Sequence, residues 1–419
     1  MTFTQCMTAV LLSMCITLPT MAQQAERLKK MPDWSVNISN AHQDSTQRTY
    51  LNLGLLSCRY NLTGIGINVV SAVSMYDAKG LQLSGLANIS GNTTAGMQAA
   101  GIANVVGDYM HGLQVAGLLN VIGEGANGMQ ISGLGNIVGN NLRGVSISGL
   151  MNIAGQEAQG VQLSLLTNIS GRNLEGVALS LLTNVSASRV KGVQLAGLLN
   201  AAGAYNQGLQ IAGLSNVALE NHGVQWGTTN VTSLNKGLQA GIVNIVIPTD
   251  SLANDSHGVQ FGILNFSRRE GIKQVGIINL KPHTRVQLIL SGGNADKGSV
   301  AVRFRNKYLY TQIGAGVYPL GTDRDFSVSG SYRAGISFPL TAALSVSGDM
   351  GYRHIETLDN KHRGYAPRMY ALQPRINLEY AFTRKFGIFA SGGYEWLHAY
   401  KGNLQTNRKA TFEVGIMLF

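Results

Sequence analysis

The chain has 419 residues, of which 52 are Gly and only 13% are Asp, Glu, Lys or Arg, and its formal net charge is +11. The charged fraction is roughly half that of an ordinary soluble protein, so a typical cytosolic enzyme is a poor fit. Pro is scarce, with 8 residues, and 45% of the chain is apolar, which excludes collagen and a low-complexity disordered chain. Abundant Gly with few charges indicates extended structure with many tight turns.

The amino terminus carries a pattern typical of a secretory leader. An apolar stretch at 9–18 is followed by the small-x-small sequence Thr20-Met21-Ala22, which predicts a signal peptide of residues 1–22. Its first residues lack Lys and Arg, and a lipoprotein box ending at Cys15 is the weaker alternative, because Met precedes that cysteine. Two of the three cysteines lie in this leader, so the mature chain would keep Cys58 and form no intramolecular disulfide.

A 16-residue repeat dominates the middle of the chain. Nine glycines are spaced by 16 from Gly80 to Gly208, and each is followed eight residues later by an asparagine. These asparagines are Asn88, Asn104, Asn120, Asn136, Asn152, Asn168, Asn184, Asn200 and Asn216. Less regular copies have a Gly-to-Asn spacing of seven, and a partial copy begins at Gly64. The period predicts a repeat architecture over residues 64–283.

Charge and spacing predict two short strands in each repeat. All eight charged residues between Gly80 and Leu219 lie 12 to 15 residues after a repeat Gly, so each unit has one crowded segment and one solvated turn. In a straight strand, the change of spacing from eight to seven would send every following side chain to the opposite face. We therefore expect a bend, for example at Ser84-Gly85 between strands at 81–83 and 86–89. Stacking of such coils predicts a β-solenoid.

Two polar ladders follow from this arrangement. We expect the asparagines to bond to one another along one corner of the solenoid, as stacked Asn and Gln side chains do in cross-β structures. A second ladder, which we expect on the outer face, consists of Gln82, Gln98, Gln114, Gln130, Gln162, Gln194 and Gln210. An ordered ligand-binding stripe is the functional alternative to a structural role for these side chains.

The repeats have a competing interpretation as strands of one large barrel. An uncharged segment of about 11 residues is also long enough for a transmembrane β-strand, and such strands would line a pore. Membrane strands are flanked by aromatic girdles at both interfaces, whereas the repeats between Gly80 and Leu219 contain only Tyr109 and Tyr205 as aromatic residues. The solenoid is therefore the favoured interpretation.

The chain changes character after Lys281-Pro282. Residues 284–419 hold 19 of the 29 aromatic residues, and apolar and polar side chains alternate there over stretches typical of long, half-buried strands. Eight such segments begin near Arg285, Ser299, Leu309, Phe326, Ala342, Tyr370, Phe386 and Thr411. Eight antiparallel strands of this length, with aromatic residues near their ends, predict a small transmembrane barrel.

The polar faces of these eight strands carry many charges. In a closed eight-stranded barrel they would face a lumen too narrow for a wide channel. There we expect them to pair into a salt-bridged plug, with a narrow ion path or gated pore as the alternative. The expected lumen residues are Arg333, Asp349, Arg353, Arg375, Glu379, Glu395 and Glu413, and Arg285, Arg303 and Arg305 share the same polar faces.

The repeat units resemble those of bacterial surface-repeat proteins, which commonly read Gly-Leu-Gln-Ile-Gly-Leu-x-Asn. The copy from Gly258 to Asn265 is especially similar, and the resemblance covers roughly residues 64 to 280. It implies no catalytic motif. The closing Phe419 resembles the terminal assembly signal of outer-membrane proteins, although it departs from the usual parity relative to the apolar face of its strand. Together the two resemblances imply an envelope protein of a Gram-negative bacterium.

No enzyme signature occurs in the sequence, which lacks a P-loop, a His-Glu-x-x-His motif and a Cys-x-x-Cys motif. We therefore expect no catalytic residue, no cofactor and no metal site. The positive excess of the last third would suit anionic lipid headgroups. Nucleic acid is not an expected partner, because no Lys/Arg cluster is larger than Arg268-Arg269.

The sequence thus predicts an all-β chain with a signal peptide (1–22), an amino-terminal segment (23–63), a β-solenoid (64–283) and an eight-stranded antiparallel transmembrane barrel (284–419). The expected function is non-enzymatic and structural or adhesive, in an outer membrane to which the barrel anchors the chain. A porin-like or transport barrel with repeat strands lining a pore is the first alternative, and a lipid-modifying enzyme is a distant third. Outer-membrane lipid is the expected partner, beside an envelope or host surface partner that the sequence does not identify. Whether the solenoid is exposed at the cell surface or lies in the periplasm also stays open at this point.

Overall fold

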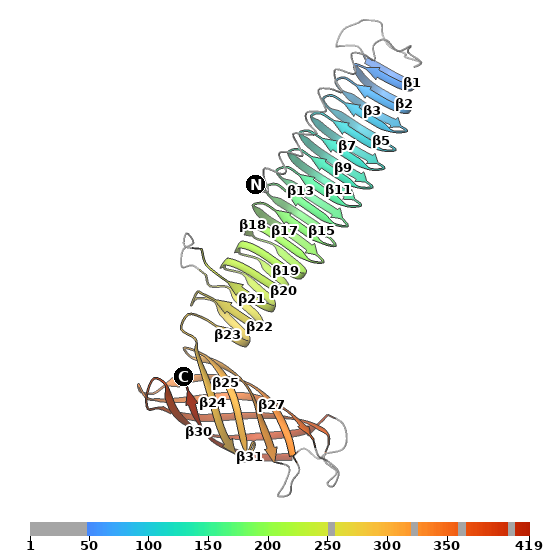
Figure 1. Ribbon diagram of the computed structural model, residues 1–419. Coiled ribbons are helices and arrows are strands. Elements are labelled where there is room, and N and C mark those ends of the chain that lie inside the picture. Colours follow the sequence, from blue (N-terminus) through green and yellow to red (C-terminus); the bar gives the residue numbers. More distant parts are fainter. Residues whose placement is uncertain (1–47, 250–255, 320–325, 359–365, 401–406) are drawn as a thin grey trace. The chain divides into compact units, whose positions relative to one another are not determined.

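The computed structural model describes residues 48–249, 256–319, 326–358, 366–400 and 407–419, so the predicted signal peptide lies outside the described residues. The chain divides into two compact units, of which the first ends at Leu219 and the second begins at Glu220. Both are built from β-strands (Figure 1). The fold is a parallel β-solenoid of about 14 turns with a closed antiparallel barrel of eight strands at the carboxy terminus. Among the described residues, no helix has the length and apolar character needed to cross a membrane.

Most coils of the first unit contain one long and one short strand. The long strands are β3 (Ala78–Ser84), β5 (Thr94–Ala100), β7 (Tyr109–Ala116), β9 (Gly125–Ser132), β11 (Asn141–Ser148), β13 (Ala158–Ser164), β15 (Leu174–Ser180) and β17 (Arg189–Ala196). The short strands are β4 (Ala87–Ser90), β6 (Ala103–Val106), β8 (Leu119–Ile122), β10 (Gly135–Val138), β12 (Met151–Ala154), β14 (Thr167–Ser170) and β16 (Thr183–Ser186). Four further strands lie at the two ends of this series, namely β1 (Arg48–Arg59), β2 (Asn61–Ser74), β18 (Leu199–Asn206) and β19 (Leu209–Asn221).

Successive coils pair in parallel at identical repeat positions. Gly80 is opposite Gly96, and Asn88 is opposite Asn104. The interpretation of the repeats as strands of one large barrel is therefore wrong, because strands of membrane barrels are antiparallel. The predicted bend is present, since β3 ends at Ser84 and β4 begins at Ala87. Parallel pairing also extends ahead of the predicted start of the array, because β1 pairs with β2 from Arg48 onward.

The repeat glycine is required by the close approach of neighbouring coils. Gly80 has a φ of 116°, a region that L side chains rarely adopt. A Cβ atom at this position would lie 2.1 Å from the carbonyl oxygen of Gly64 in the preceding coil. Glycine thus recurs every 16 residues because the backbones of neighbouring coils are in contact at this position.

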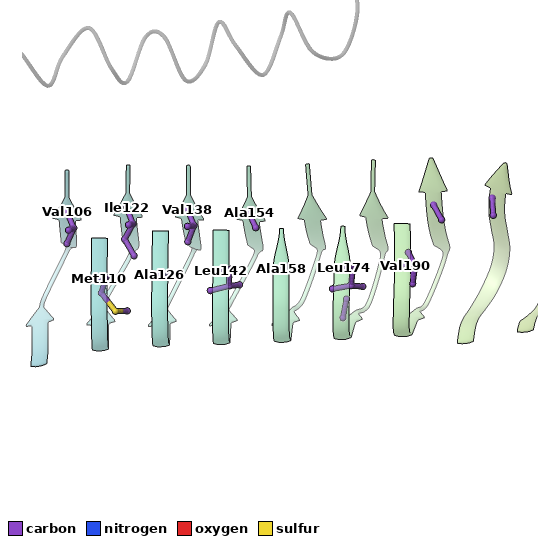
Figure 2. Close-up of a cluster of buried hydrophobic side chains, with 13 residues drawn as sticks. Val106, Met110, Ile122, Ala126, Val138, Leu142, Ala154, Ala158, Leu174 and Val190 are labelled. Atoms are coloured by element: carbon purple, nitrogen blue, oxygen red, sulfur yellow. The ribbon is translucent and has the colours of Figure 1, made fainter. Parts of the chain in front are cut away.

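The apolar core of the first unit is a narrow row between the two sets of strands. Its members include Met110, Ala126, Leu142, Ala158 and Leu174 from the long strands and Val106, Ile122, Val138 and Ala154 from the short strands. Figure 2 shows this row running from coil to coil. Because each coil contributes small or medium side chains to the row, the core is continuous along the solenoid and each coil packs mainly against its neighbours.

The second unit contains four further strands of the solenoid type and the barrel. The solenoid strands are β20 (Val224–Asn235), β21 (Leu238–Val246), β22 (Val259–Ser267) and β23 (Lys273–Leu280), and they pair in parallel. The barrel consists of β24 (Arg285–Gly293), β25 (Gly298–Asn306), β26 (Leu309–Pro319), β27 (Phe326–Pro339), β28 (Leu344–Thr357), β29 (Arg368–Ala381), β30 (Phe386–Ala399) and β31 (Asn407–Leu418). It closes through antiparallel pairing of β24 with β31, and its eight strands match the eight predicted segments.

Candidate functional site

The barrel lumen is centred on the carboxylate of Asp349. Arg375 Nε lies 2.9 Å from Asp349 Oδ1, and Arg333 Nη1 lies 3.2 Å from the same oxygen. The Tyr310 hydroxyl donates a hydrogen bond to Asp349 Oδ2 at 2.6 Å, and Asn377 Nδ2 donates another at 3.0 Å. One carboxylate therefore joins residues from four strands, β26, β27, β28 and β29.

The network continues from this centre toward the turn between β24 and β25. Gln373 accepts a hydrogen bond from Arg333 and donates one to Glu395. Glu395 Oε2 lies 2.8 Å from Arg353 Nη1, and Arg353 Nη2 lies 2.6 Å from Asp296 Oδ1 in that turn. The guanidinium of Arg353 thus links a strand carboxylate to a turn carboxylate.

Toward the opposite rim the network ends on Glu379. The Tyr310 hydroxyl also contacts Ser347 at 3.3 Å, and Ser347 donates to Glu379 Oε1 at 3.1 Å. Glu379 forms ion pairs with Arg303 and Arg305, each with an N–O distance of 2.8 Å. A continuous path of ion pairs and hydrogen bonds therefore runs from Asp296 at one rim to Arg305 near the other.

The structure brings all seven predicted lumen residues into this network. Six of them are nearly fully buried, namely Arg333, Asp349, Arg353, Arg375, Glu379 and Glu395. The seventh, Glu413, is 20% exposed at its side chain and pairs with Arg375 Nη1 at 2.5 Å. Buried charges are tolerated when they are paired and hydrogen-bonded, and this arrangement meets that condition.

Apolar side chains fill the lumen on both sides of the charged centre. One cluster contains Ile355, Met369, Ala371 and Leu397. The other contains Ile289, Ala301, Phe389 and Met417, with Phe419 packed against it. Because apolar side chains occupy the barrel interior above and below the ion pairs, the structure has the form of a plugged barrel.

A cavity of about 780 Å³ opens at the rim where the barrel begins and ends, and its lining includes His283, Arg285, Lys307, Glu379 and Phe419. It therefore ends against the lumen carboxylate of Glu379. Within the described ranges no three His, Cys, Asp or Glu side chains are grouped so as to hold a metal ion.

The repeat asparagines form a buried ladder inside the solenoid. Asn88 Nδ2 donates to Asn104 Oδ1 at 2.9 Å and to the Ala99 carbonyl oxygen at 2.8 Å. The same two bonds recur along the array, as far as the bond from Asn200 Nδ2 to Asn216 Oδ1 at 3.0 Å. All nine side chains are 0–1% exposed. Each of these side-chain amides therefore hydrogen-bonds to the next coil, and it is too deeply buried to bind a ligand from solvent.

The prediction that the glutamines lie on the outer face is wrong. They are 0–1% exposed, and they form a second interior ladder, for example from Gln114 Nε2 to Gln98 Oε1 at 2.8 Å. The reason is that the bend places Gln and Asn on the same inward side, so the aliphatic neighbours of each Gln turn outward. Amide bonds between coils compensate for burying part of this set, as from Gln98 to Gln82 at 2.6 Å and from Gln210 to Gln194 at 2.8 Å, whereas the amide of Gln130 makes no hydrogen bond among the described residues.

Comparison with protein families and with curated proteins identifies no relative of the chain. No protein-family model matches the chain, and no curated protein matches it. Functional inference therefore rests on the geometry of the lumen, the ladders and the outer surfaces.

Sequence reasoning did not single out Tyr310 and Asp296 as lumen residues. Tyr310 lies over the guanidinium of Arg303, with 4.5 Å between Arg303 Cζ and the ring centre. The spacing between Tyr310 and Gln312 could have predicted an inward Tyr310, because side chains two apart in a strand share a face. Asp296 lies in a turn, where strand parity gives no direction.

Proposed function

We propose that the protein is a non-enzymatic outer-membrane protein in which the barrel anchors the chain and the solenoid serves as a rigid structural or adhesive element of the envelope. The observation that carries this proposal is the polarity of the closed barrel. Inward positions hold the ion-pair network, whereas outward positions are apolar. On β29 the inward Arg375 and Asn377 are buried, while the outward Ile376 is 68% exposed. A transmembrane barrel has this alternation.

Aromatic residues near both barrel ends support the same proposal. Near one end, Tyr370 stacks against Tyr352 with 6.3 Å between ring centres and contacts Tyr400 at 5.2 Å. Near the other end, Phe382 contacts Tyr380 at 5.0 Å and Phe386 at 5.8 Å. Two aromatic belts flanking an apolar band are typical of strands that cross a bilayer.

The connections between barrel strands favour a periplasmic solenoid. The chain enters the barrel at Arg285, on the rim whose strand connections are residues 307–308, 340–343 and 382–385. Three of the connections on the opposite rim are longer, at 320–325, 358–367 and 400–406. Outer-membrane barrels have short periplasmic turns and longer extracellular loops. We therefore place the residues that precede Arg285 on the periplasmic side in this proposal.

Transport through a pore is the alternative function, and the plugged lumen argues against it. Open conduction would require the ion pairs around Asp349 and both apolar clusters to move. The resemblance of the repeats to bacterial surface-repeat proteins favours an envelope role without adding a chemistry. We accordingly propose no catalytic residue and no cofactor.

Epitope accessibility in a Gram-negative host tests the anchor and its direction together. One variant carries an epitope between residues 401 and 406, and a matched variant carries it after Gln156, in a solenoid turn. We expect antibody to bind the first epitope on intact cells and the second only after the outer membrane is permeabilised. Binding of the Gln156 epitope on intact cells would reverse the proposed direction. Recovery of the full chain in the soluble fraction would overturn the membrane anchor.

A further inference from the structure

Eight of the nine regular coils of the first unit expose an apolar residue where the long strand turns into the short strand. We define the tip as the residue two positions before the repeat Asn, which is six positions after the repeat Gly in the regular copies. Eight tips are 40–55% exposed, namely Leu86, Ile102, Leu118, Leu134, Leu166, Leu182, Leu198 and Leu214. Two neighbouring leucines, Leu165 and Leu181, are also exposed. Since the coils stack in register, the tips form an apolar edge along the array in which Leu150 alone is half-buried.

In six of the regular coils the opposite end carries charge. The eight charges between Gly80 and Leu219 lie 12 to 15 residues after a repeat Gly, which places them beyond the short strand and away from the tip. The short strand separates the tip from this turn in one direction along the chain, and the long strand separates them in the other. A coil of this kind has an apolar tip at one edge and charge at the other, and the array as a whole is amphipathic.

The backbone at the tips is satisfied within the solenoid. The N–H of Ile102 donates to the Leu86 carbonyl oxygen at 2.8 Å, and the N–H of Leu118 donates to the Ile102 carbonyl oxygen at 2.9 Å. The Asn and Gln side chains of these coils are buried in the two ladders. An edge of this kind can enter hydrocarbon, where unsatisfied backbone groups would be costly.

Within the second unit, the last tip already contacts the outer wall of the barrel. The Thr311 hydroxyl donates to the Ile277 carbonyl oxygen at 2.7 Å, and the Tyr332 hydroxyl donates to the Gly276 carbonyl oxygen at 3.0 Å. Gly276 is in register with Gly262, so Ile277 corresponds to Ile263, which is half exposed. Thr311 and Tyr332 lie on the outward parity of the barrel, the face that the proposed function assigns to lipid.

We propose that the apolar tips of the solenoid insert into the interfacial region of a lipid bilayer. The inference rests on the proposed function, because the outer wall contacted by the last tip is the wall that would face lipid. Lipid is favoured over a second copy of the chain. A protein interface has a polar rim and about one hydrogen bond per 100–200 Å², whereas the tips present a line of aliphatic side chains whose backbone N–H groups are already bonded.

Lipid-borne quenchers test this proposal on the full-length chain. In a background that carries Cys6→Ala, Cys15→Ala and Cys58→Ala, single cysteines are introduced as Leu118→Cys and Leu166→Cys at tips, Gln156→Cys at the charged turn and Ile376→Cys on the barrel wall. Each is labelled with a polarity-sensitive fluorophore. The protein is reconstituted into vesicles of phosphatidylcholine and phosphatidylglycerol, with and without brominated acyl chains, and is also titrated with aqueous iodide.

We expect brominated lipid to reduce the fluorescence at both tips to an extent comparable with that at Ile376, and to leave Gln156 unchanged. Quenching at Ile376 with tips that respond only to iodide would overturn the inference while leaving the barrel anchor intact. Tips protected from both quenchers would also overturn it, and would indicate that protein covers them. Loss of lipid quenching at Ile376 itself would overturn the proposed function and this inference together.

Discussion

The solenoid and the barrel both bury polar side chains in their interiors, but they satisfy these polar groups in different ways. The solenoid uses neutral amides that repeat from coil to coil, as in the bond from Asn136 Nδ2 to Asn152 Oδ1. The barrel uses charged groups that join residues distant in sequence, such as Arg303 and Glu379. Buried polar groups can thus be satisfied by the adjacent coil, which makes the interior modular, or by residues distant in sequence, which makes it cooperative. We therefore expect a substitution in the solenoid to disturb only the neighbouring coils, and a substitution in the barrel lumen to disturb the whole barrel.

The largest expected effect comes from the repeat glycine. Gly128→Ala would place a Cβ atom 2.0 Å from the Gly112 carbonyl oxygen, at a φ of 142°. Because backbone would have to move in two coils, we expect a loss of more than about 4 kcal/mol. The matched barrel control is Gly330→Ala, whose added Cβ meets nothing within 4 Å. Urea unfolding followed by circular dichroism measures both, and equal midpoints for the two variants would contradict the close-packing argument.

Breaking the lumen network should have the next largest effect. Arg353→Met removes the guanidinium between Glu395 and Asp296, and loss of one partner of a buried ion pair costs about 3–5 kcal/mol. Adding Glu395→Gln should restore part of the stability, because the second change removes a buried charge. Urea unfolding of the reconstituted barrel provides the free energies for this double-mutant cycle.

The control for the lumen network is the exposed pair between Arg368 and Glu356, with 3.1 Å between Arg368 Nε and Glu356 Oε1. We expect Arg368→Met to leave the unfolding midpoint unchanged, because exposed ion pairs are screened by solvent. A cost for Arg353→Met as small as that for Arg368→Met would show that the network does not hold the barrel together.

A single change in the amide ladder should cost less than a change in the ionic network. Asn136→Ala removes the donor to the Ile147 carbonyl oxygen at 2.8 Å and to Asn152 at 2.9 Å. A buried group left without its partner costs about 1–3 kcal/mol. Asn127→Ala, at an exposed position of β9, is the control and should be nearly neutral. Hydrogen exchange should show the loss of protection confined to the neighbouring coils, and a loss spread over the whole solenoid would remove the distinction between modular and cooperative interiors.

The sequence was sufficient for the architecture because both regions carry periodic signals. The Gly period reports contact between stacked backbones, and the alternation along β29 reports a two-sided strand. The sequence was insufficient to predict whether the glutamines face the interior or the solvent. The number of residues in the bend after Ser84 decides which alternate side chains of the coil face inward. The lumen charges were predictable from parity alone, whereas their partners were not: the link through Tyr310 depends on which strands face one another across the barrel.

Deleting two whole repeats should have the smallest effect and tests modularity most directly. Removal of residues 128–159 joins Asn127 to Gly160, which is in register with Gly144 and Gly128. Because each coil packs mainly on its neighbours, the shortened chain should keep its β-sheet circular dichroism and insert its barrel into membranes. The contrasting deletion of β28 and β29 removes Asp349 and Arg375 from the lumen and should prevent barrel closure. If the repeat deletion also abolished membrane insertion, the solenoid would be part of the folding unit of the barrel, and the two polar interiors would have to be treated as a single cooperative system.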